Sequence, residues 1–215
     1  MDQTLEGRLI ELLNARLCHD LISPVSAVNN GIELIAELGE DPGGEAMALV
    51  ATSAKEAARR LQFFRLAFGS GRLPSGAEAG VAEARAALLD LPVGERVTVN
   101  WPEGGGGRLP RQGSKIMVLL GLVALDCLGG AGRLSVNGTA VPGGLLWQAE
   151  AEGARAALAA DMAVALGGQA KPEDLTAKTA PAAYAALLAQ EIGGRIAAAP
   201  APGGIRLECL IPVAS

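Results

Sequence analysis

The sequence has few aromatic residues, few cysteines and a single histidine. Phenylalanine, tryptophan and tyrosine make up 3% of the 215 residues, whereas 50% of the residues are hydrophobic. Alanine and leucine must therefore fill most of the core, which favours helices that pack closely. The three cysteines, Cys18, Cys127 and Cys209, lie far apart and form no C-x-x-C pair. This pattern indicates neither a disulfide framework nor a zinc site, and it predicts a cytoplasmic protein.

Clusters of basic residues and long apolar segments are also missing. The net charge is −5 and the 18 lysines and arginines are scattered along the chain, which argues against a nucleic-acid partner. The longest apolar run covers residues 116–128 and contains Asp126. It is too short to span a bilayer, so we expect a buried helix there. Asp2 and Glu6 stand where a signal peptide would carry basic residues, and we expect no membrane anchor.

Two long helical patterns occupy the first third of the chain. Glycine and proline in residues 39–44 separate a first helix, over residues 5–38, from a second helix over residues 45–68. Two helices joined by a short loop form an antiparallel hairpin. In the first helix, apolar residues recur every three or four positions and predict one buried stripe, made of Leu5, Leu9, Leu13, Leu17, Leu21, Val25, Val28, Ile32 and Ile35.

A hairpin alone cannot bury the long apolar stripes of both its helices. Dimerisation into a four-helix bundle covers them most economically, and we therefore expect a homodimer. The alternative is that the hairpin packs against the rest of its own chain.

The rest of the chain has a different pattern. Residues 68–76 are dense in glycine, serine and proline, which indicates a boundary between a hairpin domain, residues 1–73, and a second domain, residues 74–215. Helices and strands alternate in the second domain, which predicts a two-layer α/β sandwich and an α+β fold for the whole chain. Gln148, Arg206 and Glu208 should face solvent. The expected helices cover residues 77–89, 111–128, 154–166 and 180–192, and the expected strands cover residues 96–101, 133–137, 145–150, 195–198 and 205–211.

His19 stands on the side of the first helix opposite the apolar stripe. It lies two positions from both Leu17 and Leu21, a rotation of about 200° at 3.6 residues per turn, so the imidazole faces water. Asp20 can accept a hydrogen bond from one ring nitrogen, which leaves the other nitrogen free to attack. This is a polar face with one nucleophile, and the alternative is a solvated surface without a role. The face is completed by Arg16, Ser23, Ser26 and Asn30.

The residues around His19 resemble a known signalling motif. The string His19-Asp20-Leu21-Ile22-Ser23-Pro24 resembles the phosphoacceptor box of two-component histidine kinases, which stands on the first helix of a hairpin. Pro24 also predicts a bend one turn beyond His19. The end of the chain looks like the end of the kinase ATP-binding domain, with a helix, the turn Gly193-Gly194-Arg195-Ile196 and a final strand that closes on Ile211-Pro212.

The groups with which these kinases bind ATP and magnesium are missing from the second domain. Gly121 and Leu125 stand where the kinases have two asparagines that hold magnesium and phosphate. The adenine-binding box is matched at best by Glu150-Ala151-Glu152-Gly153-Ala154, which lacks the second glycine. Without the asparagines the domain offers magnesium no oxygen ligand, and without the glycine turn it leaves no space for the nucleotide. The kinase reaction is therefore not expected.

An intact phosphoacceptor helix followed by a degenerate nucleotide domain resembles the ChpT-type histidine phosphotransferases of bacterial phosphorelays. The resemblance implies a homodimer whose His19 accepts a phosphoryl group from the receiver aspartate of a hybrid histidine kinase and passes it to response regulators without ATP. It implies no bound cofactor, because the partner receiver domain supplies magnesium. Two other functions stay open: an active sensor-type histidine kinase, and a non-catalytic dimer that serves as a scaffold or kinase inhibitor.

Several neighbours of His19 are candidates to assist phosphoryl transfer. Asp20 would hold the imidazole, Arg16 lies one turn before His19 and would neutralise phosphoryl charge, and Ser23 lies one turn after it and would donate a hydrogen bond. For Arg16 and Ser23 the alternative is a solvated face. Ile22 and Ala15 should be exposed and should form the surface on which a receiver domain docks.

Overall fold

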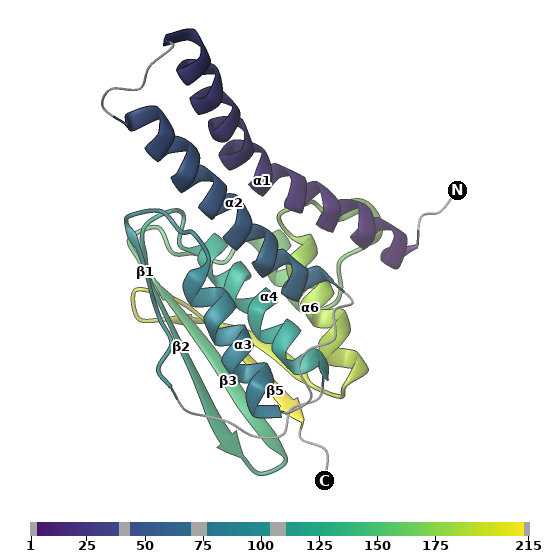
Figure 1. Ribbon diagram of the computed structural model, residues 1–215. Helices are drawn as coiled ribbons and strands as arrows, with labels where there is room; N and C mark the ends of the chain where they lie inside the picture. The colour runs from purple at the N-terminus through teal and green to yellow at the C-terminus, as the bar shows by residue number, and fades with distance from the viewer. Residues whose placement is uncertain (1–3, 39–43, 70–76, 104–110, 213–215) are drawn as a thin grey trace.

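The computed structural model describes residues 4–38, 44–69, 77–103 and 111–212. Most of the expected loop at residues 39–44 and of the expected boundary at residues 68–76 lies outside these ranges. Within them the chain forms a helical hairpin and a mixed sheet with helices on one face (Figure 1). The predicted α+β class is therefore confirmed.

The hairpin consists of α1 (Leu5–Leu38) and α2 (Glu45–Phe68), with the ends that the apolar periodicity predicts. The two helices run side by side, and one end of the hairpin projects away from the rest of the molecule (Figure 1). Gly31 permits their close approach, because a Cβ atom there would lie 2.6 Å from Cγ2 of Val50 and 3.2 Å from the carbonyl oxygen of Ala46. The helix α1 continues through Pro24, which is buried.

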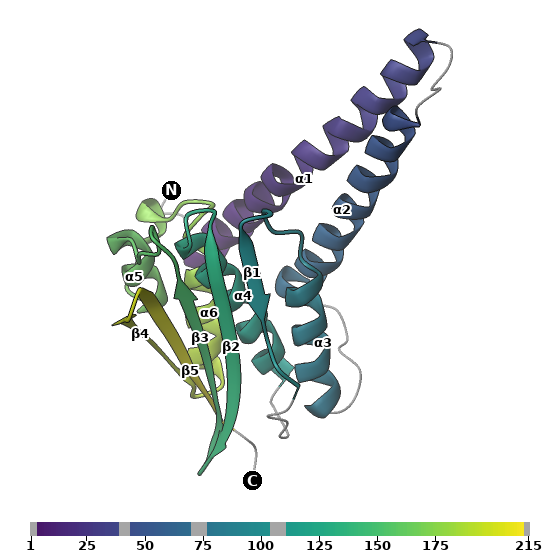
Figure 2. The same ribbon diagram turned by 90° about the vertical axis from the view of Figure 1, so that its left-hand side faces the viewer.

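The second part is a five-stranded sheet in the order β1-β2-β3-β5-β4. β1 pairs with β2 in parallel, and the other pairs are antiparallel. Figure 2 shows α3, α4 and α6 on the same side of this sheet, which confirms the two-layer arrangement. The elements are α3 (Ala77–Asp90), β1 (Val97–Asn100), α4 (Arg111–Cys127), β2 (Gly132–Val141), β3 (Gly144–Glu152), α5 (Ala160–Leu166), a short 3-10 helix (Pro172–Asp174), α6 (Ala180–Glu191), β4 (Arg195–Ala201) and β5 (Gly204–Pro212).

Alternation along the central strands separates the covered face of the sheet from its outer face. On β3, every second residue from Leu145 to Ala151 is buried, as expected for a strand covered on one side. On the outer face, the Gln148 amide donates to Glu208 over 2.7 Å, and Arg206 pairs with Glu150 across the strands. The expected outward orientation of Gln148, Arg206 and Glu208 is therefore confirmed.

One expected helix is much shorter than its sequence pattern. Residues 154–166 were expected to be helical, but α5 begins only at Ala160. The preceding segment gives its polar groups to tertiary partners: the Ala157 amide donates to the Cys127 carbonyl over 3.0 Å, and the Arg155 side chain donates to the carbonyl of Gly129. These contacts compete with helical hydrogen bonds and shorten the helix.

The hydrophobic core is continuous between the sheet domain and one half of the hairpin. Leu9 and Leu13 of the stripe on α1 are buried in this core, together with Phe63 and Phe64 of α2. The alternative in which the hairpin packs on its own chain therefore holds for this half. The stripe is not buried along its whole length within one chain, because Val25 and Ile32 are 53% and 52% exposed. None of the helices in the described ranges is long and apolar enough to cross a membrane.

Candidate phosphoacceptor site

His19 lies near the middle of α1 and is open to solvent. Its side chain is 83% exposed, as its position opposite the apolar stripe predicts. Ile22 is 67% exposed, and Ala15 and Ser23 are exposed as well. All four residues fall within about two turns of one helix, so they form a single accessible surface, which we call the His19 surface.

Asp20 forms a hydrogen bond with the imidazole ring of His19. Nδ1 of His19 lies 3.0 Å from Oδ1 of Asp20, and the second carboxylate oxygen accepts a hydrogen bond from Nε of Arg16 over 2.9 Å. An ionised carboxylate only accepts hydrogen bonds, so the neutral imidazole must carry its proton on Nδ1. Nε2 then keeps a free lone pair, which is the state that a nitrogen nucleophile requires.

Arg16 is enclosed between two carboxylates. Its two terminal nitrogens bind both carboxylate oxygens of Asp126, on α4, over 2.8 and 3.0 Å. Its side chain is only 13% exposed, so the solvated-face interpretation of Arg16 is wrong. Burial by itself lowers the pKa of the guanidinium, but the hydrogen bonds and charges of Asp126 and Asp20 outweigh it and raise the pKa above its ordinary value. Arg16 is therefore charged at every physiological pH.

A cavity of about 250 Å³ lies beside this ionic cluster. Arg16, Asp20 and Asp126 form part of its wall, and Phe64, Leu122 and Leu125 form part of the apolar remainder. The cavity is lined by residues of both the hairpin and the second domain, next to the ionic contacts of Arg16.

Comparison with known proteins decides the family. Residues 81–203, more than half of the chain, match the family of the histidine phosphotransferase C-terminal domain. The chain belongs to this family. It is similar to the protein phosphotransferase ChpT of Brucella abortus (strain 2308), with 37% identity over 126 residues, and the match covers 59% of this chain. The chain spans 58% of the length of that relative.

A solved structure of a bacterial phosphotransferase resembles the chain over nearly its whole length. The TM-score is 0.75 at 27% identity, and the match covers 94% of this chain and 95% of the other. The family match begins at residue 81, whereas the structural match, at 94% of this chain, must also include most of the hairpin that carries His19. Together these similarities confirm the resemblance to histidine phosphotransferases.

In this member of the histidine phosphotransferase family, four arginines of the hairpin bind the second domain. Arg16 binds Asp126, and Arg59 pairs with Asp90 at 3.0 Å between Nε and Oδ1. The other two donate to backbone carbonyls: Arg8 to that of Leu175 over 3.4 Å and Arg60 to that of Pro92 over 3.3 Å. These contacts join the hairpin to the sheet domain.

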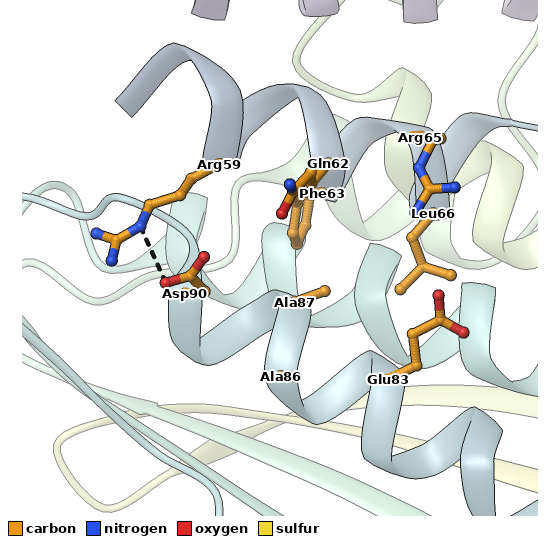
Figure 3. A pocket seen from close by; sticks show the side chains of 9 residues that line it. All are labelled: Arg59, Gln62, Phe63, Arg65, Leu66, Glu83, Ala86, Ala87 and Asp90. Atoms are coloured by element: carbon orange, nitrogen blue, oxygen red, sulfur yellow. Dashed lines mark ion pairs between the residues drawn. The ribbon is translucent and has the colours of Figure 1, made fainter. Parts of the chain in front are cut away.

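The Arg59–Asp90 pair borders a second cavity, of about 270 Å³, between α2 and α3 (Figure 3). Glu83 lies at the other end of this cavity, and its Oε2 is buried without a hydrogen-bond partner in the described part of the chain. No residue of the His19 surface lines the cavity, so it is separate from the phosphoacceptor site.

The two buried cysteines do not compete with His19 as nucleophiles. Burial, with a contribution from the charge of Asp126, raises the pKa of the Cys127 thiol to about 11. Burial raises the pKa of Cys209 to about 12. Both thiols are therefore protonated and unreactive at neutral pH. Among the described residues, no group of three or more histidine, cysteine, aspartate or glutamate side chains is arranged to hold a metal ion.

Asp126 is the residue near the phosphoacceptor that the motif around His19 does not include. The sequence contains a signal for it, since a single carboxylate interrupts the longest apolar run. A charge in such a run requires a partner. The pattern does not reveal the partner, because Arg16 is 110 positions away.

Proposed function

We propose that this protein is a histidine phosphotransferase of a bacterial two-component phosphorelay. His19 accepts a phosphoryl group from the receiver aspartate of a hybrid histidine kinase and passes it to the aspartates of response regulators, without ATP. The observation that carries the proposal is the exposed imidazole whose Nδ1 is bound to Asp20 while Nε2 stays free. Membership of the histidine phosphotransferase family and the similarity to ChpT support it.

The transfer step follows from the geometry of the imidazole. The Nε2 lone pair attacks the phosphorus of the receiver's aspartyl phosphate, an N–P bond forms, and the P–O bond to the aspartate breaks so that a carboxylate leaves. The imidazole becomes cationic, and Asp20 stabilises that charge through the Nδ1–H hydrogen bond. Transfer to a response regulator is the reverse reaction at a second aspartate.

The second domain has no role in ATP chemistry in this proposal. Gly121 stands where kinases have a magnesium-binding asparagine, and a Cβ atom there would lie 2.7 Å from the side chain of Leu88. Leu125, at the other position, packs against the hydrophobic core. A leucine offers magnesium no oxygen ligand, so the partner receiver domain supplies the metal for the transfer. We assign residues 1–73 to dimerisation and phosphotransfer and residues 74–215 to a degenerate ATP-binding-like domain.

We further propose that two copies form a four-helix bundle through the exposed apolar side chains of the hairpin. Val25 and Ile32 on α1 are seven positions apart, and Met47 and Leu61 on α2 are fourteen apart, so each pair shares one helix face. All four side chains are more than half exposed. Apolar helix faces of this length are normally covered, and pairing with the same face of a second copy buries both.

The receiver domain would dock on the His19 surface. Ile22 and Ala15, which are exposed, would supply apolar contact beside the imidazole, and the exposed Ser23 would donate a hydrogen bond to the phosphoryl group. We place this reaction in the cytoplasm, where the unpaired thiols of Cys127 and Cys209 stay reduced.

The test compares the wild-type protein with His19→Ala. Each protein is incubated with radiolabelled ATP alone, and separately with a receiver domain that carries labelled aspartyl phosphate. Label that reaches the wild-type chain only from the receiver, and that is absent in His19→Ala, supports phosphotransfer. Label from ATP alone would instead establish a kinase. Label in neither experiment would contradict the proposal and favour a non-catalytic scaffold.

A further inference from the structure

A continuous chain of ionic contacts connects the phosphoacceptor to the second domain. His19 contacts Asp20, Asp20 contacts Arg16, and Arg16 contacts Asp126, with nitrogen to oxygen distances of 2.8 to 3.0 Å. The side chains of Arg16 and Asp20 are 13% exposed and that of Asp126 is 19% exposed. Only the imidazole at the end of the chain reaches fully into solvent.

We propose that Asp126 is a positioning residue for phosphotransfer. By holding Arg16, it fixes the carboxylate of Asp20 in the orientation that keeps the proton on Nδ1 of His19 and leaves Nε2 free. The proposal deepens the proposed function and rests on it for the identity of the reacting nitrogen. It assigns to the degenerate domain a direct part in preparing the phosphoacceptor.

The geometry of the guanidinium explains why Asp126 is required. Arg16 and Asp20 are four positions apart on one helix, and such a pair alone leaves two flexible side chains free to change rotamer. The two terminal nitrogens of Arg16 instead form a two-point contact with both oxygens of Asp126. This contact fixes the plane of the guanidinium, and with it the direction of the Nε–H bond that Asp20 accepts.

The position of Asp126 is unfavourable for a carboxylate that lacks this partner. Asp126 stands in the last turn of α4, and this turn contains no basic residue. The helix dipole disfavours negative charge at this end of a helix. Asp126 is also largely buried, so its charge needs a fixed counter-ion. Arg16 supplies this positive counter-ion, and its Nε–H group donates to Asp20, the residue next to His19.

The second ion pair between the hairpin and the sheet domain provides a matched control. Arg59 and Asp90 also join α2 to the second domain, but their side chains are 40% and 50% exposed. The hydrogen bonds of Asp20 and His19 do not include either residue. Asp90→Asn therefore removes a charge between the same two parts of the molecule without acting on the imidazole.

The experiment uses the fact that His19 is the only histidine of the chain. In the full-length, ¹⁵N-labelled protein at about pH 8, above the ordinary imidazole pKa, proton–nitrogen NMR reports the tautomer of a single imidazole. The variants are Asp126→Asn, Arg16→Lys and the control Asp90→Asn. The initial rate of label transfer from a phosphorylated receiver domain is measured on the same samples.

The wild-type imidazole should be mainly in the Nδ1–H form. Asp126→Asn places an amide N–H against the guanidinium of Arg16, and Arg16→Lys removes the guanidinium. Because both variants release the carboxylate of Asp20, both should shift the imidazole tautomer towards Nε2–H. Both should also slow transfer about tenfold, the lower end of the loss that follows removal of a hydrogen-bond partner of a metal-bound histidine. Asp90→Asn should change neither quantity.

If the ¹⁵N chemical shifts of the imidazole are the same in Asp126→Asn as in the wild type, the proposal is overturned. If that variant does not fold, Arg16→Lys decides in the same way, because it breaks the same contact from the other side. An equal shift in Asp90→Asn would also overturn it, since docking of the two parts in general would then control the tautomer. A wild-type chain that accepts no label contradicts the proposed function alone, because the NMR result is independent of transfer.

Discussion

The two halves of the helical hairpin follow the same apolar period in different surroundings: the base packs on the sheet domain, and the tip projects away from it (Figure 1). In the base, Leu9, Leu13, Phe63 and Phe64 are buried in the core shared with the sheet domain. In the tip, Val25, Ile32 and Met47 are each more than half exposed. The same helical period thus serves two purposes: the base anchors the hairpin to its own chain, and the tip presents apolar side chains that one chain leaves uncovered. His19 lies between the two halves.

Truncation of a base residue should have the largest effect on folding. Phe64 is 1% exposed, stacks on Phe68 and meets Phe63 edge to face. Phe64→Ala should reduce the free energy of unfolding by about 3–5 kcal/mol, because it removes apolar contacts and leaves a cavity. Denaturant unfolding at a fixed protomer concentration measures this. Leu49→Ala is a control in the tip, where the Leu49 side chain is 44% exposed. It should reduce the free energy of unfolding by less than about 1 kcal/mol. Equal losses at both positions would contradict the contrast between base and tip.

A charge in the tip should act on association rather than on the fold of one chain. Ile32→Asp places a carboxylate in the proposed dimer interface in both copies. The dimer dissociation constant should rise at least about a hundredfold, equivalent to about 2.7 kcal/mol. Sedimentation equilibrium measures this change, while circular dichroism should report the same helix content. Asn30→Asp places the same charge on the exposed polar face and should leave the dissociation constant unchanged. A wild-type protein that is monomeric at high concentration would rule out the dimer.

An aspartate introduced beside His19, between the base and the tip of the hairpin, should affect only phosphotransfer. Ile22 is 67% exposed and lies outside the shared core, so Ile22→Asp should leave both unfolding and dimerisation unchanged. It should slow phosphotransfer about tenfold, equivalent to about 1.4 kcal/mol, because the receiver domain would meet a carboxylate in place of an apolar side chain. Asn30→Asp again serves as the control, since it lies eleven residues, about 16 Å, along the helix from His19. A normal transfer rate in Ile22→Asp would place the docking surface elsewhere.

Local pattern alone determined much of this molecule. The ends of α1 and α2 follow from the apolar period and from glycine and proline in the loop between them. The exposure of His19 follows from its rotation away from the stripe, and its contact with Asp20 joins adjacent residues. These features depend on neighbours within about two helical turns, so the sequence contains all the information that they require.

Tertiary structure decided the features that depend on distant residues. Ala157 and Arg155 donate hydrogen bonds to Cys127 and Gly129, which is why α5 begins late. The base of the stripe is covered by the sheet domain and the tip is not, although both follow the same period. Asp126 meets Arg16 across 110 positions because packing of α4 against the hairpin brings them together. Periodicity records which side of a helix is apolar, whereas the fold of the whole chain determines what lies against it.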